Sequence, residues 1–285
     1  MKAKFLITGT NGQLAKEFIR LFSKDDIPFL ALSRQELDVC NFFSVLNILK
    51  EIRPGVVINC SAYNNVDEAE SRFYEALKVN GLGVYNLAIA CKEIGAYLIH
   101  YSTDYVFDGK KGSLYAEEDK PNPLSKYATT KLIGENLLKE ILSDRYLIFR
   151  VSWVYGDGTQ NFIYKLISWS RQRDIIQVAF NEVSVPTHAS FIALKSHKAI
   201  KKGLQGLYHL VPMGYASRFE WAKKVFEGLG IKKDIQPVSK EIFNLPAKRP
   251  DFSAMDSTKI RTDLEDHFTH WEDLLKGYLK SLGGL

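Results

Sequence analysis

A tyrosine and a lysine stand four residues apart in the segment YATTK, at Tyr127 and Lys131. On a helix this spacing places the two side chains on one face. An ammonium group beside a phenol favours the phenolate, and so lowers a pKa that is ordinarily about 10. We therefore predict that Lys131 lowers the pKa of Tyr127. A tyrosine tuned in this way can donate a proton to a carbonyl oxygen while hydride reaches the carbonyl carbon.

Two hydroxyl residues, Ser102 and Thr103, follow the apolar run YLIHY at 97–101. Ligands of open α/β sheets bind beyond the carboxyl ends of the strands, so these hydroxyls are expected to face the ligand cleft. Thr103 is expected to hydrogen-bond the substrate carbonyl oxygen and fix its direction. We interpret His100 as a histidine satisfied within the sheet. Asp104 is interpreted as an anchor of the following turn through backbone hydrogen bonds.

A glycine-containing turn joins the first apolar run to a helix-length segment in FLITGTNGQLAKEF, residues 5–18. Gly9 lets the backbone pass close to a pyrophosphate, and the N–H groups that follow Gly12 offer a partial positive charge to that anion. Ala15 stands at the third position of the motif, where a methyl group still allows close helix–sheet packing. A plain strand–helix turn would also use glycine for a positive φ. The place of the turn in the first β–α unit favours a dinucleotide site.

The second apolar run ends at Ser33 and Arg34, where NAD sites commonly carry an acidic residue for the ribose 2′-hydroxyl. A hydroxyl beside a guanidinium suits a 2′-phosphate, so we predict NADPH as the cofactor, with NADH as the alternative. The competing interpretation is that Arg34 is only a surface residue after a strand. Asp38 either contacts the adenine edge or caps the helix that follows.

These residues require a scaffold of alternating strands and helices, which the first half of the chain provides. The predicted strands are near-continuously apolar, as in parallel strands covered on both faces, and lie at 4–8, 29–32, 56–60, 97–101 and 146–151. The predicted helices between them lie near 12–22, 41–52, 67–91 and 125–142. The alternation predicts an α/β fold, a Rossmann-type doubly wound parallel sheet.

The regular alternation fades after about residue 155. Further helices are predicted at 161–171, 189–204 and 217–230, the last capped by Ser217, with a short strand at 207–210. We therefore predict a dinucleotide-binding domain and a smaller α/β substrate lobe that is interleaved with it. The domain takes residues 1–155 plus about 186–210, and the lobe takes about 156–185 and 211–285.

The composition excludes several other classes of protein. Hydrophobic residues make up 46% and charged residues 25% of the 285 residues, as in ordinary folded proteins. The net charge of +5 is mild and scattered, so no nucleic acid is expected as a partner. Three cysteines far apart, at Cys40, Cys60 and Cys91, are typical of free thiols rather than a zinc site. With no signal peptide or membrane-length apolar run recognised, we expect a cytoplasmic protein with no membrane association.

In combination, these motifs resemble the extended short-chain dehydrogenase/reductase superfamily over nearly the full length. Within it the chain most resembles the dTDP-4-dehydrorhamnose reductases. The segments that carry this resemblance are TGTNGQLA (8–15), VVINCSAYNNVDEAE (56–70), STDYVFDG (102–109), NPLSKYATTK (122–131), RVSWVYGDGTQNF (150–162), VPT (185–187) and AKRPDFSAMD (247–256). STDYVFDG and the late Arg-Pro are more specific than the glycines.

The resemblance implies NADPH-dependent reduction of the 4-keto group of dTDP-4-dehydro-L-rhamnose to dTDP-L-rhamnose, in nucleotide-sugar biosynthesis. The matching catalytic residues are Thr103, Tyr127 and Lys131. Residues implied at the cofactor are Gly9, Gly12, Gln13, Leu14, Ser33, Arg34, Asp38, Cys60, Ser61, Ala62, Tyr63, Tyr127 and Lys131. Residues implied at the dTDP-sugar are Thr103, Tyr105, Tyr127, Trp153, Asn161 and Arg249, the last as a bidentate donor to a diphosphate.

The chain departs from the family pattern at one place and leaves two questions open. Family members commonly carry Asp-Gln before the Pro-Thr segment, where this chain has Asn181 and Glu182, so the wall of the sugar pocket is expected to differ in detail from theirs. Some members bind magnesium between subunits through glutamates, one of which matches Glu17. A single exposed helix glutamate is more often a solvated charge, so we assign no metal ligand. A homodimer is the family-level expectation.

Two alternatives of other kinds remain. An NAD-retaining nucleotide-sugar epimerase or dehydratase would share the fold, but Ser33 and Arg34 do not suit a cofactor held by an acidic residue. A non-catalytic regulatory subunit resembling the methionine adenosyltransferase beta subunit would need no tuned phenol. The intact set of Thr103, Tyr127 and Lys131 therefore favours an enzyme.

Overall fold

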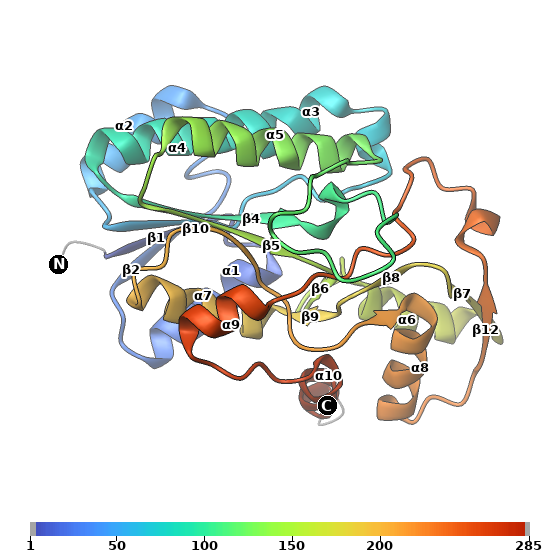
Figure 1. Ribbon diagram of the computed structural model, residues 1–285. Coiled ribbons are helices and arrows are strands. Elements are labelled where there is room, and N and C mark those ends of the chain that lie inside the picture. The colour runs from blue at the N-terminus through green and yellow to red at the C-terminus, as the bar shows by residue number, and fades with distance from the viewer. Residues whose placement is uncertain (1–3, 283–285) are drawn as a thin grey trace.

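The computed structural model of the chain describes residues 4–282. A six-stranded parallel sheet lies at its centre, in the order β10-β5-β4-β3-β1-β2 (Figure 1). Its strands are β1 (Phe5–Thr8), β2 (Phe29–Leu32), β3 (Val56–Asn59), β4 (Tyr97–Thr103), β5 (Tyr146–Val151) and β10 (Gly206–His209). The prediction of a Rossmann-type parallel sheet is confirmed.

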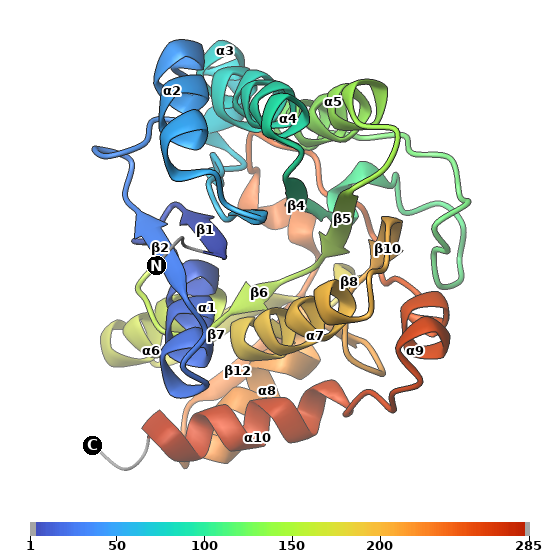
Figure 2. The ribbon, with the colours of Figure 1, turned by 90° about the vertical axis from the view of Figure 1, so that its left-hand side faces the viewer.

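Helices cover both faces of this sheet, as Figure 2 shows. α1 (Gln13–Lys24) packs against α7 (Ala189–Lys201) on one face. α4 (Gly83–Ile94) packs between α2 (Phe42–Ile52) and α5 (Lys126–Ile141) on the other. Successive strand residues point to opposite faces, so Ile7 enters the core beneath α1 and α7 while Leu6 enters the core beneath α2 and α4. Double coverage explains why β1 is buried and apolar at every position.

The strand order reverses between β1 and β3, and this switch point is where an open α/β sheet binds its ligand. Polar side chains meet there at the carboxyl ends of the two strands. The Thr8 hydroxyl donates to Asn59 Oδ1 at 3.0 Å, and the Ser61 hydroxyl donates to Thr8 at 2.9 Å. The sheet therefore positions a polar crevice beside the glycine turn.

The predicted helix at 67–91 is wrong as a continuous element. The chain instead forms a short 3₁₀ turn, η1 (Glu68–Glu70), then α3 (Phe73–Leu77), a π turn, η2 (Lys78–Leu82), and α4. The π turn holds Asn80, which accepts the Tyr63 N–H at 2.9 Å and donates to the Tyr63 carbonyl at 3.0 Å. Asn80 also donates to Thr130 at 3.1 Å. The irregular turn thus ties the segment after β3 to α5, beside Lys131.

The second half contributes short elements at one end of the sheet, on the right in Figure 1. They include α6 (Phe162–Gln172), α8 (Arg218–Leu229) and a parallel pair, β7 (Ile175–Ala179) and β12 (Asp234–Val238). Two-residue strands pair as β6 (Val154–Tyr155) with β9 (Thr187–His188), and β8 (Val183–Ser184) with β11 (Ala216–Ser217). The remaining elements are η3 (Asp104–Val106), η4 (Lys240–Phe243), α9 (Thr258–Leu264) and α10 (Trp271–Leu282).

The three helices predicted in this half are present within three residues of their predicted ends, and Ser217 caps α8 in a capping box with Glu220. The small strands and α9 and α10 were not predicted. The division into two lobes stays a prediction, and its ends at 1–3 and 283–285 lie outside the described residues. Ile260 and Phe268 pack into the core beneath α1 and α7, although the prediction gave them to the substrate lobe. Between residues 4 and 282, no helix combines the length and apolarity needed to cross a bilayer.

Candidate active site

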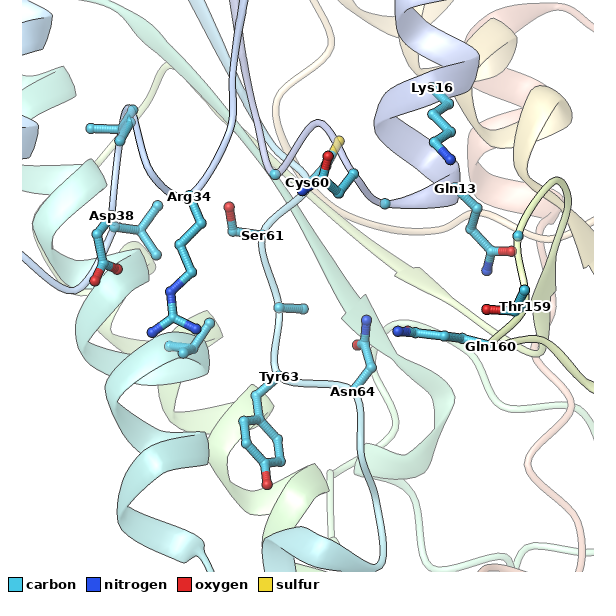
Figure 3. A pocket seen from close by; sticks show the side chains of 18 of the residues that line it. Gln13, Lys16, Arg34, Asp38, Cys60, Ser61, Tyr63, Asn64, Thr159 and Gln160 are labelled. Atoms are coloured by element: carbon cyan, nitrogen blue, oxygen red, sulfur yellow. The ribbon is translucent and has the colours of Figure 1, made fainter.

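A cavity of about 510 Å³ opens at the switch point of the sheet (Figure 3). Its walls are the β1–α1 turn, the end of β2, the segment after β3 and a loop at 157–160. The predicted cofactor residues that line it are Gly9, Gly12, Gln13, Arg34, Asp38, Cys60, Ser61, Ala62 and Tyr63. Leu14, Tyr127 and Lys131 line an adjoining cavity. The structure therefore brings most of the predicted cofactor residues together.

The glycine turn is shaped for a close backbone approach. Gly9 has φ +68°, and a Cβ there would lie 3.0 Å from both the N and Oγ of Ser61. A side chain at this position would be strained by the backbone conformation and crowded against Ser61. α1 begins directly after Gly12, so its first N–H groups, which have no partner within the helix, lie beside the cavity. α1 is 12 residues long, and the N-terminus of such a helix can hold a pyrophosphate.

The end of β2 is arranged differently from the prediction. The Ser33 hydroxyl donates to Glu36 at 2.7 Å and the Ser33 N–H donates to the same carboxylate at 2.8 Å, so Ser33 does not offer its hydroxyl to the cavity. Arg34 extends into the cavity between Asp38 and Tyr63 (Figure 3). Asp38 accepts the Cys40 N–H at 3.0 Å, and Asn41 rather than Asp38 caps α2. Arg34 and Asp38 therefore line the cavity, whereas Ser33 does not.

Sequence reasoning missed the far wall of this cavity. Lys16 lies on α1, and Asn64 directly follows the predicted cofactor residue Tyr63. Thr159 and Gln160 come from the loop at 157–160, almost 150 residues after the glycine turn. Gln160 points toward Asn64 across the cavity (Figure 3). The GTQNF part of a quoted family segment was the only signal that could have indicated this loop.

The loop before α6 is held in place by its own hydrogen bonds. Asn161, predicted to contact the sugar, donates to the carbonyls of Gly156 at 2.8 Å and Gly158 at 3.0 Å. It also caps α6 by accepting the Tyr164 N–H at 3.1 Å. The side-chain amide of Asn161 therefore forms its hydrogen bonds within the loop and the start of α6. The structure does not bring it to the other predicted substrate residues. Its interactions shape the wall that carries Gln160.

The three predicted catalytic residues meet in the adjoining cavity, of about 300 Å³. Thr103 ends β4, while Tyr127 and Lys131 lie one turn apart on α5, which Ser125 caps. All three side chains are buried. Ser102 lines the same cavity, and its buried hydroxyl has no hydrogen-bond partner among residues 4–282. A polar ligand fits such a site, because an unpaired buried hydroxyl is costly.

The electrostatics of the Tyr–Lys pair differ from the prediction. Burial raises the pKa of Tyr127, Asp104 raises it further, and the Thr103 hydroxyl lowers it. Lys131 donates to the Tyr101 carbonyl at 2.5 Å, and burial lowers the pKa of Lys131 to about 8, against the effect of Glu135. The prediction that Lys131 lowers the pKa of the phenol is therefore wrong for this arrangement. Desolvation dominates, and the phenol keeps its proton at neutral pH.

His100 lies inside the sheet, where its Nδ1 is 3.3 Å from the Asn59 amide nitrogen. Burial lowers the pKa of His100, and Lys131 lowers it further, so the ring is neutral. Asp104 anchors the turn as predicted, because its backbone carbonyl accepts the Phe107 N–H at 3.1 Å. Its side chain was not predicted to take part, and it accepts hydrogen bonds from the hydroxyls of Thr103, Ser184 and Ser253.

A third cavity, of about 560 Å³, lies on the other side of Trp153. Trp153 has φ +40°, a strained value for a bulky residue, and its indole lines both this cavity and the catalytic one. The Arg218 guanidinium lies 3.7 Å from the centre of the Trp153 ring. The cavity is lined by aromatic and basic side chains, which suits a ligand with a flat base and anionic groups. Its aromatic and charged lining is Asp67, Trp153, Phe162, Lys165, Trp169, Arg173, Glu182, Arg218, Trp221, Lys240, Phe243 and Arg249.

Carboxylates hold the two central arginines of this cavity. Arg249 forms a two-pronged pair with Asp67, at 3.0 and 2.8 Å, so its fork is directed at a side chain rather than left free for a diphosphate as predicted. Glu182 lies 3.3 Å from Arg218 and accepts the Tyr105 hydroxyl at 2.8 Å. The departure from the family pattern at Glu182 thus places a buried carboxylate in this wall.

Glu17 is paired rather than free. Arg20 donates to its carboxylate at 2.6 Å and also bonds Asp157 on the loop beside the first cavity. Burial raises the pKa of Glu17, and Arg20 opposes this effect. Within the described part of the chain, no group of three or more His, Cys, Asp or Glu side chains could hold a metal ion.

A doubly wound sheet, a glycine turn at its switch point and a Thr–Tyr–Lys group beside it define a member of the extended short-chain dehydrogenase/reductase class. The family model for the RmlD substrate binding domain matches residues 3–283. The chain belongs to the dTDP-4-dehydrorhamnose reductase family.

Three relatives show how far the similarity extends. A dTDP-4-dehydrorhamnose reductase of Streptomyces griseus is 32% identical over 289 residues, which cover 99% of this chain and 95% of that protein. The crystal structure of a dTDP-4-dehydrorhamnose reductase from Clostridium acetobutylicum is 35% identical with a TM-score of 0.95, and covers 98% of this chain and 99% of its own. A dTDP-4-dehydrorhamnose reductase from Bacillus anthracis, solved in complex with NADP, is 34% identical with a TM-score of 0.94, over 99% and 100% of the two chains.

Proposed function

We propose that the protein reduces the 4-keto group of dTDP-4-dehydro-L-rhamnose to give dTDP-L-rhamnose, with NADPH as the cofactor. One observation carries this proposal: a buried cavity that holds Thr103, Tyr127 and Lys131 lies between a dinucleotide-sized cavity and an aromatic, basic one. The order of the cavities suits a cofactor on one side, a keto sugar in the middle and a nucleoside diphosphate on the other.

The residues present fit a dinucleotide. Gly9 leaves room for a pyrophosphate against the backbone, and the start of α1 supplies N–H donors to it. Arg34 is placed for a 2′-phosphate, which favours NADPH. Lys131, whose pKa burial lowers to about 8, is still mainly protonated at neutral pH and can donate to ribose hydroxyls. When bound, the cofactor supplies the hydride.

Tyr127 acts as the proton donor to the sugar C4 oxygen. Because burial raises the pKa of Tyr127, the phenol carries its proton at neutral pH until negative charge develops on the keto oxygen. Thr103 hydrogen-bonds the same oxygen and orients it. Lys131, on the same face of α5, holds the cofactor ribose through its ammonium group and is not required to lower the pKa of Tyr127. Walls of buried side chains exclude water from the reacting atoms.

The aromatic cavity holds the nucleotide. Trp153, stacked against Trp221 with ring centres 5.5 Å apart, supplies a flat surface, and Arg218 supplies charge beside it. Arg249 lines this cavity, and Tyr105, which lines the catalytic cavity, donates its hydroxyl to Glu182 in the wall of the aromatic one. The sugar then extends from this cavity past Trp153 toward Tyr127.

Spectroscopy with purified protein tests the proposal. Incubation with dTDP-4-dehydro-L-rhamnose and NADPH should consume the absorbance of the reduced nicotinamide, more slowly with NADH. Loss of absorbance only with UDP-linked keto sugars would reject the dTDP assignment. No consumption with either cofactor, or tightly bound NAD without net oxidation, would reject the reductase and favour an epimerase or dehydratase.

We also propose a homodimer, which rests on the family resemblance, and a location in the cytoplasm, which rests on the sequence in which we recognise no signal peptide. Light scattering of the purified protein tests the homodimer. A mass of two chains supports it, and a mass of one chain contradicts it.

A further inference from the structure

Asp104 lies directly after the catalytic threonine, and its buried carboxylate collects three hydroxyl groups. Oδ2 accepts from Ser184 at 2.8 Å and from Ser253 at 2.5 Å, while Oδ1 accepts from Thr103 at 3.2 Å. The two serines lie on adjacent segments, because Val183 donates to the Asp251 carbonyl and accepts the Ser253 N–H. The carboxylate therefore has one oxygen fixed by the second half of the chain and one that faces Thr103.

The limited number of hydrogen bonds that Thr103 can form means that its contact with Asp104 decides where the Thr103 proton points. A hydroxyl has one proton and two lone pairs, and one lone pair of Thr103 already accepts the Tyr105 N–H at 3.2 Å. When Asp104 is ionised, the Thr103 proton points to Oδ1. When Asp104 is neutral, its own proton sits on Oδ1, because Oδ2 holds two donors. That proton then takes the second lone pair of Thr103, and the Thr103 proton must point away from Asp104, toward Tyr127 and the keto oxygen.

We propose that Asp104 is a positioning residue whose protonation state sets the direction of the Thr103 hydroxyl, so that Thr103 donates to the keto oxygen only while Asp104 is neutral. The inference rests on the proposed function. Asp104 itself does not contact the reacting atoms, because it acts through Thr103.

The surroundings of Asp104 place this change near neutral pH. Burial raises the pKa of Asp104 to about 6, against the hydrogen bonds from Ser253, Ser184 and Thr103 and the charge of Arg218. Arg218 of α8 is the cation that faces it, and Glu182 offsets Arg218 by pairing with it. The titratable hydroxyls beside it are Tyr105 of η3 and Tyr127 of α5, and Asp104 helps to raise the pKa of each. The raised pKa means that Asp104 is neutral below this pH and ionised above it.

The pH profile of kcat in wild type and Asp104→Asn tests the inference. Asparagine mimics the neutral acid, because its oxygen can accept from both serines while its amide donates to Thr103. Wild-type kcat should rise as the pH falls through about 6. Asp104→Asn should lack this rise, which is the acidic limb of the kcat profile. At about pH 8, kcat of the variant should exceed kcat of the wild type by roughly tenfold or more. A variant that keeps the limb, or is slower than wild type at every pH, would overturn the inference.

Ser253→Ala provides an independent test. Removing a donor to the carboxylate disfavours its ionised form, so the limb should move upward by roughly one pH unit. Ser170→Ala, which removes a hydroxyl that donates to the Ile167 carbonyl on the same helix, is the matched control and should leave the limb in place. A limb that stays in place in Ser253→Ala would contradict the assignment to Asp104.

Infrared difference spectra give a readout that does not depend on activity. The wild type should show a carboxyl band that titrates near pH 6 and disappears in Asp104→Asn. A wild type that shows this band but reduces no dTDP-keto sugar would reject the proposed function alone. A wild type that reduces the sugar without such a band would reject the role of Asp104 alone.

Discussion

The cofactor side and the substrate side of the molecule are built in different ways. Around the dinucleotide cavity, a turn of a few consecutive residues forms most of the site: Gly9 has φ +68°, and a Cβ at Gly12 would lie 3.2 Å from the Gly9 carbonyl oxygen. Around the aromatic cavity, pairs of side chains from distant segments form the site. Arg249 meets Asp67 across 182 residues of sequence, and Tyr105 meets Glu182 across 77.

This difference teaches where each kind of specificity resides. A backbone site recognises what all dinucleotides share, and it changes little when a side chain changes. A site built from paired charges can change its ligand when one member of a pair changes, and Glu182, paired with Arg218, is one such member. Substitutions should therefore separate the two sides, with Tyr127 at their junction affecting catalysis itself.

The largest effect is expected at this junction. Tyr127→Phe removes the proton donor, so kcat should fall by about 10²–10⁴-fold while the Kd for NADPH stays nearly constant. Steady-state rates and a fluorescence titration with NADPH measure the two quantities. Tyr164→Phe, on an exposed part of α6, is the control and should retain full activity. A protein that acts as a scaffold would show no change in either quantity with Tyr127→Phe.

Stability should depend on pH through Asp104. The pKa of Asp104, which burial raises to about 6, exceeds the unfolded value of 3.8, so the folded state binds this proton more tightly. The free energy of unfolding of the wild type should therefore fall, relative to Asp104→Asn, as the pH rises from about 4 to about 6. The expected change in this difference is on the order of 2–3 kcal/mol. Urea unfolding at several pH values measures it, and a difference that stays constant with pH would contradict the raised pKa.

Arg249→Ala should affect the substrate side alone. Loss of the guanidinium leaves Asp67 without its partner and removes a charge from the aromatic cavity, so KM for the dTDP-sugar should rise by roughly 10–100-fold. Arg249→Lys should recover little of this loss, because an ammonium cannot form the two-pronged pair. Binding of NADPH should be unchanged in both variants. An equal loss of cofactor affinity would show that the two sides are not separate.

Arg34→Ala should produce the smallest effect and confine it to the cofactor side. The Kd for NADPH should rise by about tenfold, because one charge-assisted contact is lost, while the Kd for NADH stays constant. KM for the sugar is the internal control. If both cofactors weakened equally, Arg34 would contribute to the adenine pocket rather than to recognition of the 2′-phosphate.

The same difference between the two sides explains what could be predicted from the sequence. Strands β1 to β5 were predicted within two residues at each end, because parallel strands buried on both faces are short, apolar runs. The π turn at Asn80 escaped prediction, since one irregular turn does not change the apolar pattern of a helix. Strands of two residues, such as β8 and β11, have no periodicity to detect.

Site residues follow the same division. The sequence indicated Gly9 and the Tyr127–Lys131 pair, because each lies in a local motif. It could not indicate that Ser184 and Ser253 would meet at Asp104, nor that burial would raise the pKa of Tyr127. Both depend on which distant segments pack together.

Isotope transfer tests the central claim most directly, namely that the Thr103, Tyr127 and Lys131 cavity is where a keto sugar accepts hydride. NADPH carrying deuterium at nicotinamide C4 would be mixed with dTDP-4-dehydro-L-rhamnose and the wild-type protein, and the product examined by NMR. The account predicts deuterium at sugar C4, formed at a rate that Tyr127→Phe reduces at least a hundredfold. Absence of the label from C4, or transfer at an undiminished rate in Tyr127→Phe, would contradict it.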